Sequence, residues 1–221
     1  GFCTLNSLKN NTSENNTEYK GQLEAGFAYG KGDNDITAAN PYLEYTRRFS
    51  TRFSMNARVL FLTVKGELSA QDGLSDGFIS GIYAVSEKTK FTLGIKIPFS
   101  DGNSMDRGLP LPMGYQTSLG TIDLILGFQY NLNQFGIMAG IQQPLSQNKN
   151  QFLREYYPPG SPAGNYQSTN NFRRKGDALF RINRDFKIKE NKLKAIPGLL
   201  FIYHTDNDTY TDESRYNVTI Y

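Results

Sequence analysis

The sequence predicts an all-β fold: an antiparallel transmembrane β-barrel of the outer-membrane type, with ten strands in this chain. Three observations lead to this fold. Apolar and polar residues alternate in segment after segment, short and long connections alternate between these segments, and the composition is polar yet aromatic. The chain has 15 Phe, 14 Tyr and 21 Gly, with a mean hydropathy of −0.52. Such a composition suits a barrel, because only alternate residues of its strands face lipid.

Membrane-spanning helices are excluded by the sequence. No stretch approaches the roughly 18 consecutive apolar residues that a helix needs to cross a bilayer. The longest apolar stretch, residues 196–203, contains Pro197 and Gly198. We expect a bulge or a kink at Pro197, because proline cannot donate a hydrogen bond to the ladder of a central strand.

A period of two defines the predicted strands. In the first strand, Leu23, Phe27 and Tyr29 would lie on one face, and Gln22 and Glu24 on the other. The same pattern recurs along the chain, although it is less regular in the second and fourth segments. The ten predicted strands cover residues 18–29, 41–49, 53–62, 77–85, 90–97, 121–130, 135–142, 177–183, 193–203 and 215–221.

The connections favour a barrel over a soluble β-sandwich, which would also alternate. Short turns are predicted at residues 50–52, 86–89, 131–133 and 185–191, and long polar connections at 31–40, 66–76, 99–113, 145–171 and 205–213. This order fits a barrel with one periplasmic and one extracellular rim. Aromatic residues beside the short turns, such as Phe49 with Phe53 and Tyr130 with Phe135, fit an interfacial girdle.

Residues 1–16 are rich in Asn, Ser and Thr and predict an extended periplasmic lead-in, so the barrel covers 17–221, with both termini in the periplasm. The net charge of +3 is too small and too scattered to indicate nucleic-acid binding. The single cysteine, Cys3, excludes an internal disulfide, and the single histidine, His204, leaves little for a metal site or a catalytic triad. We therefore predict no enzyme, cofactor or metal.

If the apolar rows face lipid, the opposite rows place charged side chains inside the barrel. Because unpaired buried charges cost several kcal/mol, we expect most of them to pair. Ten strands would then give a nearly closed lumen, and twelve a narrow, weakly anion-preferring pore. The predicted lumen-facing residues are Lys20, Glu24, Glu44, Arg48, Arg58, Lys90, Lys96, Asp123, Asp177 and Arg181.

Several motifs resemble the outer-membrane proteins of Bacteroidetes-type bacteria that are grouped under the meta-pathway phenol degradation name and often called transporters. They are Pro-Tyr-Leu-Glu-Tyr at 41–45, Thr-Arg-Phe-Ser at 51–54, Gly-Leu-Ser-Asp-Gly at 73–77, and the segments 93–98, 114–120 and 142–145. The resemblance covers residues 40–152. It implies an antiparallel outer-membrane barrel that takes up small, hydrophobic molecules and has no catalytic residues. Ser75 departs from the Gly-Leu-Gly-Asp of that family.

The predicted function is a passive outer-membrane channel or transporter for small hydrophobic or polar solutes in a Gram-negative bacterium. The alternative is a non-transporting structural subunit of a larger outer-membrane complex. Its partners would be outer-membrane lipid and other outer-membrane proteins. The segment 154–160, with paired Tyr and Pro, could form a lip that binds a partner or a sugar, could fold inward as a constriction, or could be a plain exposed loop. We also expect the native chain to continue past Tyr221, which would bring the strands to twelve.

Overall fold

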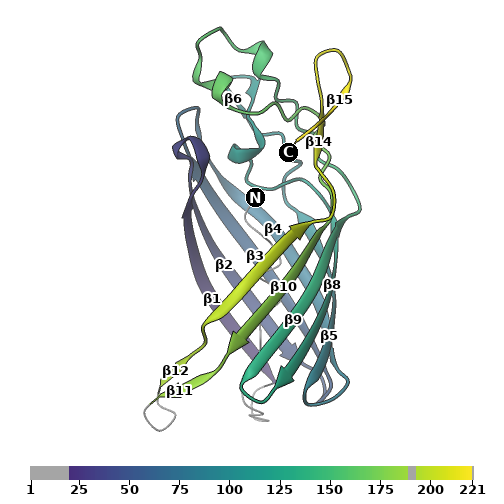
Figure 1. Cartoon of the computed structure of the whole chain (residues 1–221). Helices are drawn as coiled ribbons and strands as arrows, with labels where there is room; N and C mark the ends of the chain where they lie inside the picture. Colours follow the sequence, from purple (N-terminus) through teal and green to yellow (C-terminus); the bar gives the residue numbers. More distant parts are fainter. Residues whose placement is uncertain (1–19, 189–192, 221) are drawn as a thin grey trace.

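The structure is a computed structural model and describes residues 20–188 and 193–220, so the predicted lead-in 1–16 lies outside the described residues. Nine strands form one antiparallel sheet that curls into a half-barrel (Figure 1). The strands are, in sheet order, β1 (Gly21–Lys31), β2 (Thr37–Arg48), β3 (Phe53–Lys65), β4 (Ala70–Ala84), β5 (Thr89–Pro98), β8 (Asp123–Leu132), β9 (Phe135–Pro144), β10 (Asp177–Arg184) and β13 (Gly198–His204). The predicted all-β, antiparallel fold is confirmed. Among the described residues, no helix is long and apolar enough to cross a membrane.

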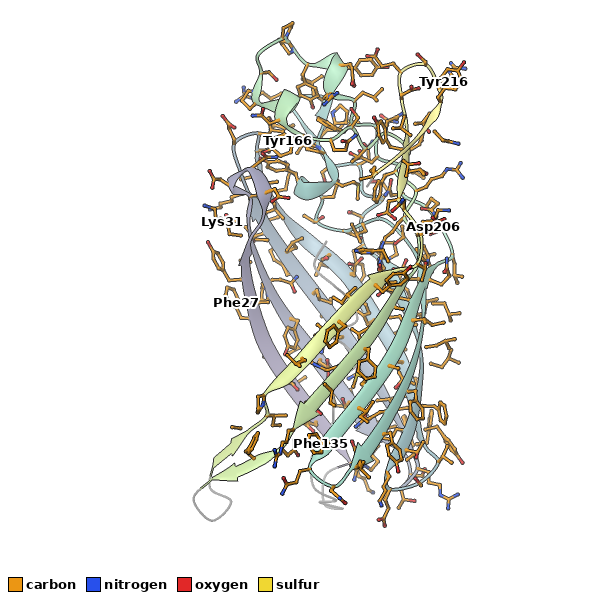
Figure 2. The ribbon with its side chains drawn as sticks, in the orientation of Figure 1. Phe27, Lys31, Phe135, Tyr166, Asp206 and Tyr216 are labelled. Carbon is orange, nitrogen blue, oxygen red and sulfur yellow. The ribbon has the colours of Figure 1, made fainter. Side chains whose placement is uncertain are left out.

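Each strand pairs with the next one in the sheet in antiparallel register, and the period of two separates two faces. Leu23 and Phe27 of β1 lie on the convex face and are exposed, and Figure 2 shows Phe27 pointing away from the sheet. Glu24 has the opposite parity and pairs in register with Glu44 of β2, which is buried on the concave face. The convex face is therefore apolar and the concave face largely polar.

The predicted tenth strand, residues 215–221, is not part of this sheet. Instead β15 (Asn217–Thr219) pairs with β14 (Thr209–Thr211) in a separate hairpin, whose Thr209 also bridges to Arg173. Because the antiparallel sheet has nine strands, its first strand starts at one end of the half-barrel and its last strand finishes at the other end. Within the described residues the chain thus starts at the end with the short turns and finishes at the end with the long connections (Figure 1), whereas the sequence predicts both termini at the short-turn end.

The strand predicted at residues 193–203, with a bulge or a kink at Pro197, is divided into two strands at the proline. β12 (Leu193–Ala195) pairs only with β11 (Phe186–Ile188), and β13 starts after the proline. Proline has no N–H to donate, but its carbonyl accepts a hydrogen bond from the Arg184 N–H at 3.0 Å. The β11–β12 pair therefore extends the β10–β13 hairpin as a separate short ribbon.

Two of the predicted long connections are short. β2 begins at Thr37 and β4 at Ala70, which leaves only residues 32–36 and 66–69 as turns. The first residues of β4 are mostly polar or small, so the sequence does not reveal them as part of a strand. In the structure the pairing of β4 with β3 continues as far as Ala70, opposite Lys65. The connections that remain long are residues 99–122 and 145–176, and both lie at the same end of the half-barrel (Figure 1).

These two long connections pack together into a cap. The cap contains the strands β6 (Met105–Asp106) and β7 (Leu109–Pro110) and the 3-10 turns η3 (Met113–Tyr115), η4 (Arg154–Tyr156) and η5 (Pro162–Asn165). Its core combines side chains of the cap and of the adjoining strand ends: Ala38, Val64, Leu111, Tyr115, Phe152, Ala163 and Tyr166. The hydroxyls of Tyr115 and Tyr166 lie 2.8 Å apart within this core. Burial and this contact raise the pKa of Tyr166 above its usual value.

Asn150 joins the two cap segments. Its Nδ2 donates to the carbonyls of Gly102 and Leu111, both at 2.9 Å, and its Oδ1 accepts from Thr169 Oγ1 at 2.7 Å. The side chain is fully buried, so these hydrogen bonds replace the water that it loses. One amide thus fixes how the two long connections lie against each other.

Gly120 provides a test of the cap. Its φ is +68°, and a Cβ there would lie 2.3 Å from the Asp101 carbonyl oxygen. Gly108 has a similar φ of +81°, but a Cβ there meets nothing within 4 Å. We expect Gly108→Ala to cost about 1 kcal/mol through backbone strain alone, and Gly120→Ala to cost clearly more. Limited proteolysis of residues 99–122 together with urea unfolding measures both. Equal losses in the two variants would contradict this packing.

Candidate functional site

The concave face carries a row of five charged side chains and one phenylalanine that crosses six strands. The backbone register links Glu24, Glu44, Arg58, Phe78, Lys96 and Asp123, in that order. Of the predicted lumen-facing residues, Glu44, Arg58, Lys96, Asp123 and Asp177 are buried, Glu24, Lys90 and Arg181 are half-buried, and Lys20 and Arg48 are exposed. The structure thus gathers the buried members into two clusters, one on each side of Phe78.

The first cluster surrounds Glu44. Arg58 Nε donates to Glu44 Oε2 at 2.5 Å, and the Arg58 guanidinium stacks over the Tyr42 ring, 4.5 Å from its centroid. The Tyr42 hydroxyl donates to Glu24 Oε1 at 2.9 Å. Tyr42 shares the parity of Glu44 along β2, so its place in this cluster could have been found from the alternation.

The second cluster binds the cap to the wall. Arg174 lies in the second long connection and donates to Asp123 Oδ2 at 2.7 Å and also to Asp177. Lys96 Nζ lies 3.1 Å from the same Asp123 oxygen, and His204 Nδ1 lies 2.5 Å from Asp177 Oδ1. Burial opposes the charge of Arg174, but the two carboxylates outweigh it and raise the pKa of its guanidinium above the usual value.

The sequence did not predict Arg174 as a member of this cluster. Arg174 lies in a long connection, where the alternation of strand residues cannot tell which way a side chain points. Within the described residues, Asp123 Oδ1 has no hydrogen-bond partner, although the residue is fully buried. Gln142 of β9 donates to the other oxygen, Oδ2, which also faces Lys96 and Arg174. All the positive charge around this carboxylate therefore converges on one of its two oxygens.

An apolar cluster also occupies the concave face, which the sequence does not predict. It consists of Phe78, Ile125, Met138 and Leu179, with Leu60 packed against it. Ile125 and Leu179 each lie two residues beyond a carboxylate of the second cluster, on the same face of their strands. Charges alone therefore do not fill this face: an apolar layer lies directly beneath the network of Asp123 and Asp177.

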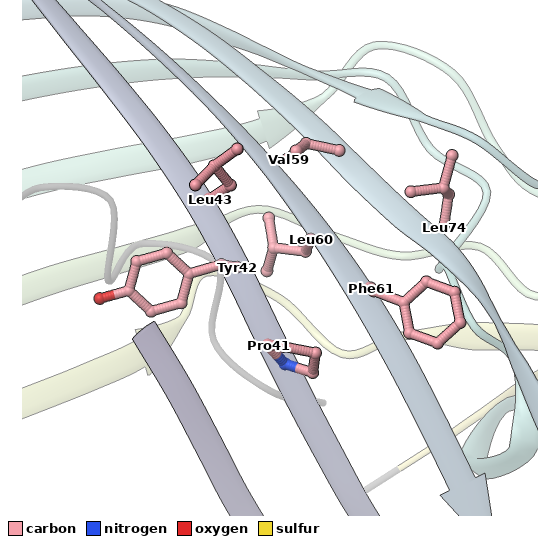
Figure 3. Close-up of a pocket in the computed structure, with 7 residues that line it drawn as sticks. All are labelled: Pro41, Tyr42, Leu43, Val59, Leu60, Phe61 and Leu74. Atoms are coloured by element: carbon pink, nitrogen blue, oxygen red, sulfur yellow. The ribbon is translucent and has the colours of Figure 1, made fainter. Parts of the chain in front are cut away.

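The wall of the half-barrel has an apolar pocket of about 260 Å3 where β2, β3 and β4 meet (Figure 3). The β2–β3 ladder keeps its register but lacks the pairs between Ala39–Thr63 and Tyr42–Leu60, whereas the β3–β4 register shifts between Val59 and Phe61. The pocket is lined by Pro41, Tyr42, Leu43, Val59, Leu60, Phe61 and Leu74.

Pro41 explains part of this interruption, since it has no N–H for the ladder. The side chain of the preceding Asn40 donates instead to the Phe61 carbonyl at 3.0 Å. The pocket lining takes Leu43 and Phe61 from the exposed, convex face. Tyr42 and Leu60 belong to the concave rows of Glu44 and Arg58. Side chains of both faces thus meet at a point where two neighbouring ladders are irregular.

No protein-family model matches this chain, and no curated protein matches it. The resemblance to the meta-pathway phenol degradation group stays a prediction. In the described part of the chain, no group of three or more His, Cys, Asp or Glu side chains could hold a metal ion.

The buried pair of Arg58 and Glu44 gives a test of the concave face. Arg58→Ala would leave Glu44 buried without its cation, and we expect a loss of about 3–5 kcal/mol in the free energy of unfolding. The double variant Glu44→Gln/Arg58→Met removes both charges and should lose clearly less. Lys31→Ala, which breaks the exposed contact with Asp35, is the control and should change little. Urea unfolding measures all three, and a double variant as unstable as Arg58→Ala would contradict the pairing.

Proposed function

We propose that this chain belongs to an outer-membrane β-barrel that acts as a passive transporter of small, mainly hydrophobic molecules. The convex face supports a lipid environment. It exposes large apolar side chains on strand after strand, among them Phe27, Leu43, Phe61, Leu93 and Phe180. A contiguous apolar surface of this kind is unfavourable in water and indicates contact with lipid or protein. The short turns would face the periplasm and the cap the outside.

The observation that carries the transport proposal is the wall pocket. A route straight along the concave face must pass the two charged clusters and the apolar layer, each of which is packed. A route through the wall passes Leu60, Phe61 and Leu74, at the point where the β2–β3 and β3–β4 ladders are irregular. An apolar molecule gains by moving from a polar surface to such a lining. It would leave sideways, from the concave face into the lipid.

A structural subunit of a larger outer-membrane complex is the second candidate, and one observation favours it. β13 is an edge of the sheet in the described residues and is apolar on both faces, with Leu199, Leu200, Phe201 and Ile202 all exposed. An exposed apolar edge strand readily pairs with another strand. In a complete barrel this strand would pair with a further strand of the barrel; in a subunit it would pair with a partner protein.

The membrane part of the proposal is tested on the native protein extracted from outer membranes. A closed barrel pairs all of its strand backbones and resists detergent until it is heated. We expect the boiled and unboiled protein to migrate differently on a gel, with β-type circular dichroism before boiling. Recovery in the soluble fraction, or equal mobility of the two samples, would contradict a membrane barrel.

The route through the wall is tested by filling the pocket. Leu74→Trp should lower the uptake of a radiolabelled monoaromatic hydrocarbon to near background, in Gram-negative cells that express the protein and keep a lipopolysaccharide leaflet. Leu93→Trp is the matched control, because Leu93 is equally a convex-face leucine but lies outside the pocket lining, and it should behave as wild type.

Other outcomes separate the alternatives. Uptake that does not depend on the protein at all would contradict transport and favour the structural subunit. Uptake lowered equally by the two tryptophans would contradict the wall route. Rapid swelling of proteoliposomes in arabinose, without hydrocarbon uptake, would instead indicate a channel for polar solutes.

A further inference from the structure

A second pocket, of about 560 Å3, lies at the cap end and is separate from the wall. Its volume falls within the range of about 300–1,000 Å3 found for small-molecule sites. One side is the β14–β15 hairpin, and the other is formed by residues 151–171 of the second long connection together with Pro110 of the first. The two sides are fixed to each other: Thr211 N donates to the Asn170 carbonyl at 2.8 Å, and Asn170 Nδ2 donates to the Thr211 carbonyl at 3.0 Å.

The polar side chains of this pocket are available to a ligand. Gln151, Asn171, Glu213 and Arg215 all line it, and within the described residues the structure gives their side chains no hydrogen bond or ion pair. The backbone around them is nevertheless well fixed. Asn171 N donates to the Asn150 carbonyl at 2.7 Å, which ties the pocket to the amide that joins the two cap segments.

Two of these residues hold an unfavourable backbone conformation. Asn171 has a φ of +50° and Arg215 a φ of +66°. Asparagine tolerates the left-handed region. Arginine has no such tolerance, and glycine is the usual residue at this position of a hairpin turn. The turn itself needs only backbone contacts of Arg215, whose N–H donates to the Asp212 carbonyl at 3.1 Å. Strain of this kind is often retained where the side chain has a function.

The remaining lining includes apolar and aromatic side chains beside the polar residues Asn170, Thr211 and Asp212. Leu153 is 4% exposed and contributes to the floor together with Pro110, while Tyr156 of η4 is 62% exposed. Tyr156 belongs to the segment 154–160, for which the sequence allows a sugar-binding lip. The pocket thus combines an aromatic ring with amides that donate and accept hydrogen bonds and with carboxylates that accept them. Arg215 stands beside Asp212 and Glu213, so the lining offers no cluster of cations for a phosphate or a sulfate.

The geometry points to a binding site for a neutral saccharide of two or three rings. Sugar hydroxyls donate and accept at once, as amides do, and the C–H faces of a sugar ring pack on tyrosine and leucine. Asn171 and Gln151 would bind hydroxyls from one side of the pocket and Arg215 and Glu213 from the other, with the ring of Tyr156 against a sugar face. This site does not depend on the transport route, because it shares no lining residue with the wall pocket.

The test uses the full chain in lipid nanodiscs on an array of neutral di- and trisaccharides, with sialylated and sulfated glycans as charged comparators. The best-retained sugar is then titrated. Tyr156→Ala and Arg215→Gly should each weaken binding by about tenfold, the loss expected for a central contact. Tyr216→Ala is the control: this tyrosine lies at the tip of the same hairpin (Figure 2), is 72% exposed and does not line the pocket.

Arg215→Gly separates binding from folding. Because glycine suits a positive φ, this variant should keep or raise the melting temperature while it loses affinity. The site is supported if a neutral saccharide is bound and both pocket variants weaken it while Tyr216→Ala does not. It is overturned if no neutral saccharide is retained, if the charged glycans bind better, or if Tyr216→Ala weakens binding as much as Tyr156→Ala.

Discussion

Arg174 joins two carboxylates from different strands, Asp123 of β8 and Asp177 of β10, and much of the remaining structure depends on this contact. Both carboxylates are buried on the concave face, where an unpaired charge costs several kcal/mol. Their cation comes from the second long connection, so that connection must return to the wall at this point. Lys96 and His204 complete the network from β5 and β13. One network of ion pairs and hydrogen bonds thereby holds four strands and the cap together.

Further contacts hold the cap in place in addition to the ion pairs of Arg174. Ser118 of the first long connection donates to Asp76 of β4 at 2.6 Å, so both connections reach the concave face through a buried carboxylate. Asn150 then joins the two connections above these anchors. The polar pocket is built on the outer side of this arrangement, against the β14–β15 hairpin. Its walls are held by backbone hydrogen bonds, which leaves the side chains of Asn171 and Arg215 available.

The period of two was sufficient to predict most strands of the sheet, because a one-residue error would move every apolar side chain to the wrong face. It could not predict what depends on three-dimensional proximity. Arg174 has no parity in a connection, and the apolar layer of Ile125 and Leu179 occupies rows that alternation assigns to polar groups. The start of β4 was missed because polar and small residues dominate it, with Leu74 as its one large apolar side chain. The segment predicted as the last strand has strand composition, yet its residues Asn217–Thr219 pair within a local hairpin, and composition does not distinguish the two pairings.

The wall pocket shows how the sheet can contain an irregularity without losing the strands around it. Pro41 removes one donor from the ladder, and the Asn40 amide supplies a donor to the Phe61 carbonyl that would otherwise lack one. Directly below, the buried pair of Glu44 and Arg58 ties β2 to β3 again within a few residues. The weak place in the ladder is thus bounded by a strong contact, and its side chains are apolar on both faces of the sheet. This irregularity leaves an apolar pocket in a wall that is otherwise continuous in register.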